Sequence, residues 1–326
     1  MENVFQRGYC RLALHSTRFT TYDDDTSPAH AMARRASRPS ALRYIRQVRG
    51  ENDGPPCFPY RFDMQPNRFK ARLLARQQQL GIWSMLASSN VVEVLTQSDF
   101  DWILIDTEHA ANEVPMVQEQ LRAAAQSTVS AVVRPGTNDT VQIKRLLDIG
   151  AQTLLVPMVD TQEDAQRAAA AVRYPPAGIR GVSSATRANR YGRDGQYLHE
   201  ANDEVCLLVQ LETGKALANL EQIAAVDGVD ALFIGPSDLA AALGHLGDFR
   251  HPDVQAAIHD AYGRAHRCGK PIGILMTDPT LAAEYLRIGF DYVALATDIG
   301  LLRSGAEATL KQGAANTSSH QEQSKT

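Results

Sequence analysis

Eight short β-rich apolar runs alternate with Ala-rich helical windows from Met64 onward, and this alternation constrains the fold more than any other feature. Strands that alternate with helices are typical of βαβ units and a parallel sheet. Eight strand and helix units over the ~250 residues usual for the fold predict a TIM (β/α)8 barrel over residues 64–312. The expected strands are Gly81–Leu86, Trp102–Asp106, Ala131–Arg134, Thr153–Met158, Val205–Glu212, Ala231–Gly235, Ile272–Leu275 and Tyr292–Ala296.

The helical windows are opened in several cases by Asp, Thr or Pro and closed by Gly. One long segment, 173–204, contains Tyr-Pro-Pro-Ala-Gly and Arg-Gly-Val-Ser-Ser and fits no regular element. An insertion of that length is expected to be a lid or binding loop. The expected helices are Val114–Gln126, Thr140–Leu147, Thr161–Val172, Leu217–Val226, Pro252–Cys268 and Pro279–Ile288.

The two ends of the chain differ from the barrel in composition. Residues 1–63 hold many Arg and no Lys, an Asp23–Asp25 run and no hydrophobic period, so we expect a disordered or extraneous extension. An upstream start codon with the true beginning at Met64 is one explanation, and the acidic run argues against a transit peptide. The polar residues 313–326 are expected to form a disordered tail.

Composition excludes several classes of protein. The net charge of the 326 residues is −4, which requires neither nucleic acid nor an anionic membrane as a partner. The apolar runs are interrupted by Asp, Glu or Pro and fall far short of the ~20 residues of a spanning helix. The cysteines lack Cys-x-x-Cys spacing and are interpreted as reduced thiols of a cytoplasmic protein. They are Cys10, Cys57, Cys206 and Cys268.

Ionisable residues follow four of the expected strands, at the end where a parallel barrel builds its active site. They are His109, Arg134, Glu212 and Asp238. Taken singly, each has an ordinary structural explanation, and Asp238 in Pro-Ser-Asp-Leu resembles a helix N-cap. Four such groups at one rim favour a functional site, because desolvating charges is unfavourable unless they meet partners or a metal.

The residue types suggest the chemistry of this rim. Glu212 and Asp238, with water and substrate oxygens, suit a hard ion such as Mg²⁺ or Mn²⁺, whereas no His/Cys cluster suggests zinc. The planar guanidinium of Arg134 suits a substrate carboxylate or an enolate oxygen. Gln210 lies two residues before Glu212 and therefore shares its strand face.

Two carboxylates are candidates to tune the His109 imidazole. Asp106 lies three residues before His109 on the same strand end. Asp148 follows the expected helix Thr140–Leu147, at the opposite end of its own barrel, so it would act through a subunit contact or a network. A carboxylate partner would fix the tautomer of His109 and raise its basicity.

Several motifs in order resemble the HpcH/HpaI aldolases, class II pyruvate aldolases of the phosphoenolpyruvate/pyruvate barrel superfamily. The resemblance runs from Met64 to about Leu301. The motifs are Asp106-Thr-Glu-His109-Ala, Val132-Val-Arg134-Pro, Ile143-Lys-Arg-Leu-Leu-Asp-Ile-Gly-Ala, Arg173-Tyr-Pro-Pro-x-Gly-Ile-Arg-Gly-Val, Gln210-Leu-Glu212 and Gly235-Pro-Ser-Asp-Leu.

The resemblance implies a role for each matching residue. Glu212 and Asp238 would bind the divalent metal, Mg²⁺, Mn²⁺ or Co²⁺, with no organic cofactor. Gln210 and Ser237 would contact the substrate, and Arg134 would stabilise the enolate. His109 would accept the proton, and Asp148 would raise the basicity of His109. Thr107 and Thr213 depart from the usual Gly and Ser, which bears on substrate preference alone.

The implied reaction is retro-aldol cleavage of a 4-hydroxy-2-oxo acid to pyruvate and an aldehyde. The expected substrate is 4-hydroxy-2-oxoheptane-1,7-dioate, which gives succinate semialdehyde, and the alternative is 2-dehydro-3-deoxyglucarate, which gives tartronate semialdehyde. Lys215 is interpreted as helix-entry surface, so a Schiff base is disfavoured. A barrel that binds a ligand without catalysis is the remaining alternative. The resemblance also implies a homo-oligomer, expected to be a hexamer, that exchanges the helix Ile299–Gln312.

Overall fold

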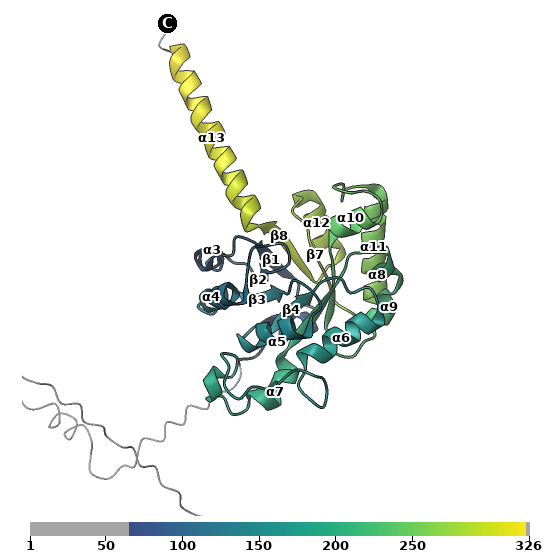
Figure 1. Ribbon diagram of the computed structural model, residues 1–326. Coiled ribbons are helices and arrows are strands. Elements are labelled where there is room, and N and C mark those ends of the chain that lie inside the picture. Colours follow the sequence, from purple (N-terminus) through teal and green to yellow (C-terminus); the bar gives the residue numbers. More distant parts are fainter. Residues whose placement is uncertain (1–64, 324–326) are drawn as a thin grey trace, which may run out of the picture. The chain divides into compact units, whose positions relative to one another are not determined.

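The computed structural model describes residues 65–323, and the extension expected over 1–63 lies outside them. The described chain forms a closed barrel in which each strand pairs with the next and β1 pairs with β8 (Figure 1). All eight pairings are parallel, which confirms the TIM barrel. The strands are β1 Gln79–Ser84, β2 Trp102–Asp106, β3 Ser130–Arg134, β4 Thr153–Val156, β5 Cys206–Leu211, β6 Ala231–Ile234, β7 Ile272–Leu275 and β8 Tyr292–Thr297.

Helices cover the outside of the barrel and begin at capping side chains. Thr161 and Asp164 form a reciprocal capping box, and Asp139 and Asp278 accept hydrogen bonds from the first turns of their helices. The helix expected over 217–226 is instead two short helices that meet at Asn219, whose φ of −100° and ψ of 10° interrupt the helix. The covering helices are α3 Ser89–Leu95, α4 Val114–Ala124, α5 Thr140–Asp148, α6 Gln162–Val172, α8 Gly214–Ala218, α9 Leu220–Ala224, α10 Pro236–Ala242, α11 Pro252–Arg267 and α12 Pro279–Ile288.

Large aromatic side chains fill the barrel interior. Trp102 and Tyr292 are fully buried and meet edge to face, with ring centroids 5.8 Å apart. Two strand glycines make room for them: a Cβ at Gly81 would lie 2.1 Å from the Trp102 ring, and one at Gly273 would lie 2.4 Å from the Tyr292 ring. The interior therefore depends on glycine wherever a ring crosses a neighbouring strand.

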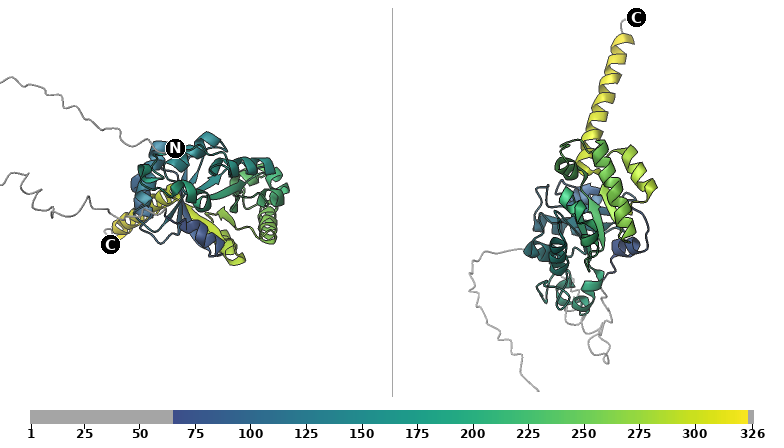
Figure 2. Two further views of the ribbon diagram at one scale, coloured as in Figure 1. Left: turned by 90° about the horizontal axis from the view of Figure 1, so that it is seen from below. Right: turned by 90° about the vertical axis from the view of Figure 1, so that its right-hand side faces the viewer.

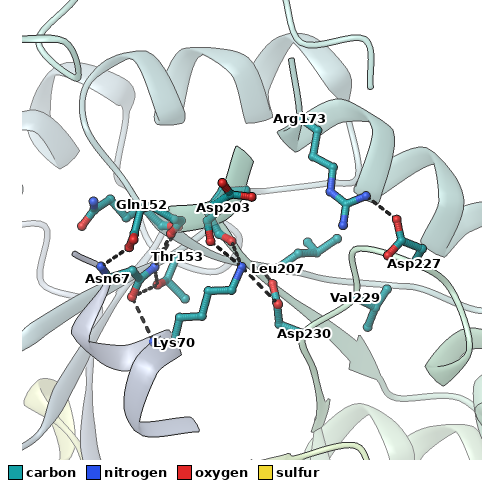
Figure 3. A network of polar contacts seen from close by, with 12 residues as sticks. Asn67, Lys70, Gln152, Thr153, Arg173, Asp203, Leu207, Asp227, Val229 and Asp230 are labelled. Carbon is teal, nitrogen blue, oxygen red and sulfur yellow. Dashed lines mark hydrogen bonds and ion pairs between the residues drawn. The ribbon is translucent and has the colours of Figure 1, made fainter. Parts of the chain in front are cut away.

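Helix α2 (Arg68–Leu74) closes the end of the barrel where the strands begin. Its Phe69 ring contacts both interior aromatics, at 5.9 Å from Trp102 and 5.4 Å from Tyr292. Lys70 of the same helix donates from Nζ to the carbonyls of Asp203 and Val205, each at 2.8 Å (Figure 3). This end is thus sealed by apolar packing and by a polar network.

The segment 173–204 contains the 3₁₀ turn η1 (Arg190–Gly192) and helix α7 (Tyr197–Glu204). It connects α6 to β5 and therefore lies at the end where strands begin, opposite the mouth of its own barrel. Arg180 holds it there through an ion pair with Asp148, Nη2 to Oδ1 at 3.0 Å. A lid formed by this segment would therefore not cover the mouth of its own barrel, because a connection that follows a barrel helix returns to the strand-start end.

Helix α13 (Asp298–Gln323) leaves the barrel after β8 and projects away from it (Figures 1 and 2). The boundary expected at residue 312 falls inside this helix, and 313–323 are helical instead of a disordered tail, because extending a formed helix is easier than nucleating one. Residues 301–314 are all exposed, including Leu302 and Leu310. Within the described chain, no helix combines the length and apolarity needed to cross a membrane.

Candidate active site

The strand ends open into a cavity of about 380 Å³. Five of the residues predicted for the site line it, which places them at one mouth, and several apolar side chains also line it and form its apolar wall. The predicted residues are His109, Arg134, Gln210, Ser237 and Asp238, and the apolar wall includes Met85, Phe233, Phe249, Leu275 and Met276.

Arg134 is fixed at this mouth by two carboxylates. It pairs across the sheet with Asp106, so the two side chains leave adjacent strand ends together. The guanidinium donates to both oxygens of Asp106, at 2.8 Å from Nε and 2.6 Å from Nη2, and its Nη1 lies 2.8 Å from Glu108 Oε2. Burial tends to raise the pKa of Asp106, but the bonds from Arg134 outweigh it and lower that pKa. Asp106 therefore orients Arg134, and the prediction that it tunes His109 is not supported.

Glu108 is a site residue that sequence reasoning missed. Burial raises the pKa of its carboxyl, Arg134 lowers it, and the charges of Asp106 and Asp238 raise it further. The available signal was strand alternation, which places Glu108 on the same side as Asp106. The mouth thus carries one more acidic group than the sequence interpretation assigned.

Glu212 is 2% exposed, and it follows β5, the strand whose Gln210 lines the cavity. Its Oε1 accepts the Met158 N–H at 2.8 Å, and its other oxygen accepts a bond from the Gln210 amide. Burial is the main cause that raises the pKa of Glu212 to about 7, and the nearby charges of Glu108 and Asp238 add to it. A buried carboxylate beside two others is unfavourable without a cation.

The residues present fit a hard divalent metal. Glu212 and Asp238 would supply the carboxylate ligands. Arg134 carries a positive charge nearby, but its guanidinium is already paired with Asp106 and Glu108. Backbone shape agrees, because a Cβ at Gly235 would lie 2.7 Å from Glu212 Oε2. Glycine thus keeps the space beside the carboxylate open.

His109 lies at the exposed rim, with 57% of its side chain accessible and its Nε2 3.9 Å from Glu108 Oε2. Asp148 does not reach it, because Asp148 ends α5 at the opposite end of the barrel and is bound to Arg180. Lys215 is an exposed residue of α8, as expected for helix-entry surface. Within one protomer, the structure therefore brings together all predicted site residues except Asp148.

A closed barrel with buried carboxylates and a fixed arginine at its mouth has the architecture of an enzyme that acts on small anionic substrates. The family model for HpcH/HpaI aldolase/citrate lyase matches residues 79–305. The chain belongs to this family, and it is a lyase of the aldolase type.

Named relatives support the assignment. A pyruvate aldolase of Rhizobium etli is 52% identical over 76% of this chain and 97% of its own length. A 4-hydroxy-2-oxo-heptane-1,7-dioate aldolase of Klebsiella pneumoniae is 55% identical over 74% of this chain and 92% of its own. A solved family structure from Burkholderia cenocepacia has a TM-score of 0.74 at 38% identity and covers 76% of this chain and 98% of that one.

Proposed function

We propose that this chain is a class II aldolase that cleaves a 4-hydroxy-2-oxo acid to pyruvate and an aldehyde. The observation that carries the proposal is the buried Glu212 carboxylate, whose pKa is raised to about 7 beside Glu108 and Asp238 at a cavity mouth. A divalent metal held by Glu212 and Asp238 would act as a Lewis acid toward the keto acid. Mg²⁺, Mn²⁺ and Co²⁺ are the proposed ions.

The chain's own residues provide the remaining steps. Arg134, held rigidly by Asp106 and Glu108, would direct its guanidinium charge toward the 2-oxo oxygen, where negative charge develops as C3–C4 breaks. His109 at the rim would accept the proton of the 4-hydroxyl, either directly or through water. Gln210 and Ser237 would contact the pyruvate half of the substrate.

The cavity wall favours 4-hydroxy-2-oxoheptane-1,7-dioate over 2-dehydro-3-deoxyglucarate. Met85, Phe249 and Leu275 present apolar surface, which suits the methylene groups of succinate semialdehyde better than the hydroxyl of tartronate semialdehyde. The relative from Klebsiella pneumoniae, named for the heptanedioate, supports the same choice.

A coupled assay tests the reaction. Pyruvate release from a panel of 4-hydroxy-2-oxo acids is followed through lactate dehydrogenase, with and without EDTA. We expect activity that disappears with the chelator and returns with Mg²⁺, Mn²⁺ or Co²⁺. Cleavage that persists in EDTA would refute the metal mechanism. His109→Ala is expected to lose turnover while keeping metal affinity, and near-normal rates in that variant would refute its role as the base.

We further propose a homohexamer in which Asp148 acts on His109 of a neighbouring copy. Exposed Leu302 and Leu310 on α13 support association, and the distance between the two ends of one barrel requires a second subunit. The test mixes subunits of His109→Ala and Asp148→Asn, each impaired alone. Regained activity in the hybrid supports action between subunits, whereas hybrids no better than the parents argue against it. Light scattering measures the number of subunits.

A further inference from the structure

Three metal-ligating side chains meet on the connection between α10 and α11, outside the carboxylate group of the mouth. One ring nitrogen each from His245 and His251 and a carboxylate oxygen of Asp253 lie within 4.8 Å of one another. His245 Nε2 is 3.2 Å from Asp253 Oδ2, and the two imidazole rings stack with centroids 3.4 Å apart. The three residues are spread over nine positions of a connection without Cys, so their spacing alone does not indicate a zinc site.

The backbone of this connection fixes the two histidines near each other. Gly244 and Gly247 adopt positive φ angles of 86° and 81°, which allows two tight turns in succession. The His245 N–H donates to Ala240 at 2.8 Å, and the His245 carbonyl accepts from Asp248 at 2.9 Å. Asp248 in turn accepts from the His251 N–H at 3.1 Å. The ligand set is therefore supported by turns instead of depending on a loose loop.

Helix capping explains only part of the arrangement. His251 Nδ1 accepts the Asp253 N–H at 3.2 Å and so caps α11. That bond does not account for His245, whose ring covers His251 and shares the Asp253 carboxylate. Two imidazoles and a carboxylate are the ligands of borderline transition dications, whereas Mg²⁺ prefers oxygen alone.

We propose that His245, His251 and Asp253 form a second metal site, which binds Zn²⁺ or a similar transition dication. Three protein ligands leave a fourth position for water. Bonds of about 2.0 to 2.1 Å would draw the ligand atoms together and open the stacked rings, since a metal lies in the plane of each imidazole it binds. His245 and His251 are partly exposed and Asp253 is exposed, so none of the three side chains is buried in the core.

The position of the cluster suggests what the ion would do. Phe249 lies between the two histidines in the sequence and contributes to the apolar lining of the cavity at the mouth. Its carbonyl accepts from Gln255 at 2.6 Å, and Arg250 beside it forms an ion pair with Asp278. These two contacts already hold the wall around Phe249. An ion that links His245 to the start of α11 would add a third contact. The proposed effect is structural support of the rim, with no chemical step.

The test measures Zn²⁺ binding to the full chain without an affinity tag, in a Glu212→Gln/Asp238→Asn background that removes the proposed catalytic ligands. Equilibrium dialysis with metal analysis is expected to find one tightly bound Zn²⁺ per chain. His245→Gln should weaken it about tenfold or more. His259→Gln is the matched control, because His259 is also partly exposed and lies 3.4 Å from a single carboxylate, that of Glu284. Absence of tight binding, or equal affinity after His245→Gln, would overturn the proposal.

Two further measurements cover folding and competing ligands. If the double variant fails to fold by circular dichroism, the same titration of the otherwise unaltered chain should lose one Zn²⁺ equivalent on His245→Gln and none on His259→Gln. Co²⁺ substitution then identifies the ligands, because thiolate ligation gives an intense charge-transfer band and imidazole with carboxylate does not. A thiolate band that persists after His245→Gln would assign the ion to exposed Cys268 or another thiol and refute the cluster.

Discussion

The two ends of the barrel bury polar groups in opposite ways. At the end where strands begin, Lys70 satisfies two backbone carbonyls and lies 3.4 Å from the Asp230 carboxylate, so charge and hydrogen bonds are balanced (Figure 3). At the mouth, Glu212 is buried among other carboxylates, and Gln210 Oε1 accepts no hydrogen bond within the described chain. One end is arranged for stability, and the other holds unbalanced charge that a ligand would balance.

The largest effect is expected from removing the Glu212 carboxylate. Glu212→Ala should reduce turnover by about 10³-fold or more, because a ligand of the proposed Lewis acid is lost. The variant should remain folded. Glu204→Gln is the control at the other end, where the carboxylate accepts the Asn67 N–H at 2.5 Å. Steady-state kinetics and circular dichroism measure both, and comparable turnover losses in the two variants would contradict the division between the ends.

The same carboxylate should make the metal-free protein less stable as pH rises. The folded-state pKa of Glu212 is about 7, above its usual 4.5, because burial disfavours the charged form. The unfolded chain therefore releases this proton first, and stability falls between about pH 4.5 and 7. The loss would be about 3 kcal/mol. Urea unfolding in EDTA at both pH values measures it, and Glu212→Gln should abolish the difference attributable to this group. An unchanged pH dependence in Glu212→Gln would show that the carboxylate is not destabilising.

Sequence alone predicted the barrel because strand and helix periods are local signals. All eight expected strands are present, and deviations occur at ends or at single residues such as Asn219, where one side chain decides whether a helix continues. The lid or binding loop expected over 173–204 was not assigned to either end of the barrel, although counting strands and helices would have placed it at the strand-start end. Topology supplied that information without any knowledge of side-chain contacts.

The sequence predicted which residues belong to the candidate site better than it predicted which side chains they contact. Strand-end positions identified Arg134 and Glu212, but sequence could not show that Asp106 binds Arg134 and leaves His109 free, since that depends on register between strands. Alternation along the strand end could have indicated Glu108, but its burial and its contact with Arg134 depend on the neighbouring strand and are not visible in the sequence. Within one chain, Asp148 lies at the opposite end of the barrel from His109, so the proposed contact between them requires a second subunit, which a single sequence does not show.

A smaller effect is expected at the end where strands begin. Lys70→Met keeps the length of the side chain but removes the donor to the Asp203 and Val205 carbonyls and the partner of Asp230. Losing the part-buried bond to Val205 and the exposed bond to Asp203 should lower the free energy of unfolding by about 2 kcal/mol. Denaturant titration measures the loss, and kcat should stay near normal. A large fall in kcat with unchanged stability would mean that the network reaches the mouth after all.

The smallest effect is expected from a charge pair on the outer wall, between Glu221 of α9 and Arg264 of α11. Hydrogen bonds from Arg264 lower the pKa of Glu221 to about 2, with Nε to Oε1 at 2.7 Å. The depressed pKa gives stability above the unfolded value of 4.5 that is lost as pH falls toward 2. Because half of the Glu221 side chain is exposed, solvent screens the pair, and Glu221→Gln should cost less than about 1 kcal/mol at neutral pH. The free energy of unfolding of the unaltered chain and of Glu221→Gln is measured at low and high salt. The difference between the two proteins should shrink as salt rises. A loss as large as that of Lys70→Met, insensitive to salt, would show that screening does not separate the outer wall from the buried ends.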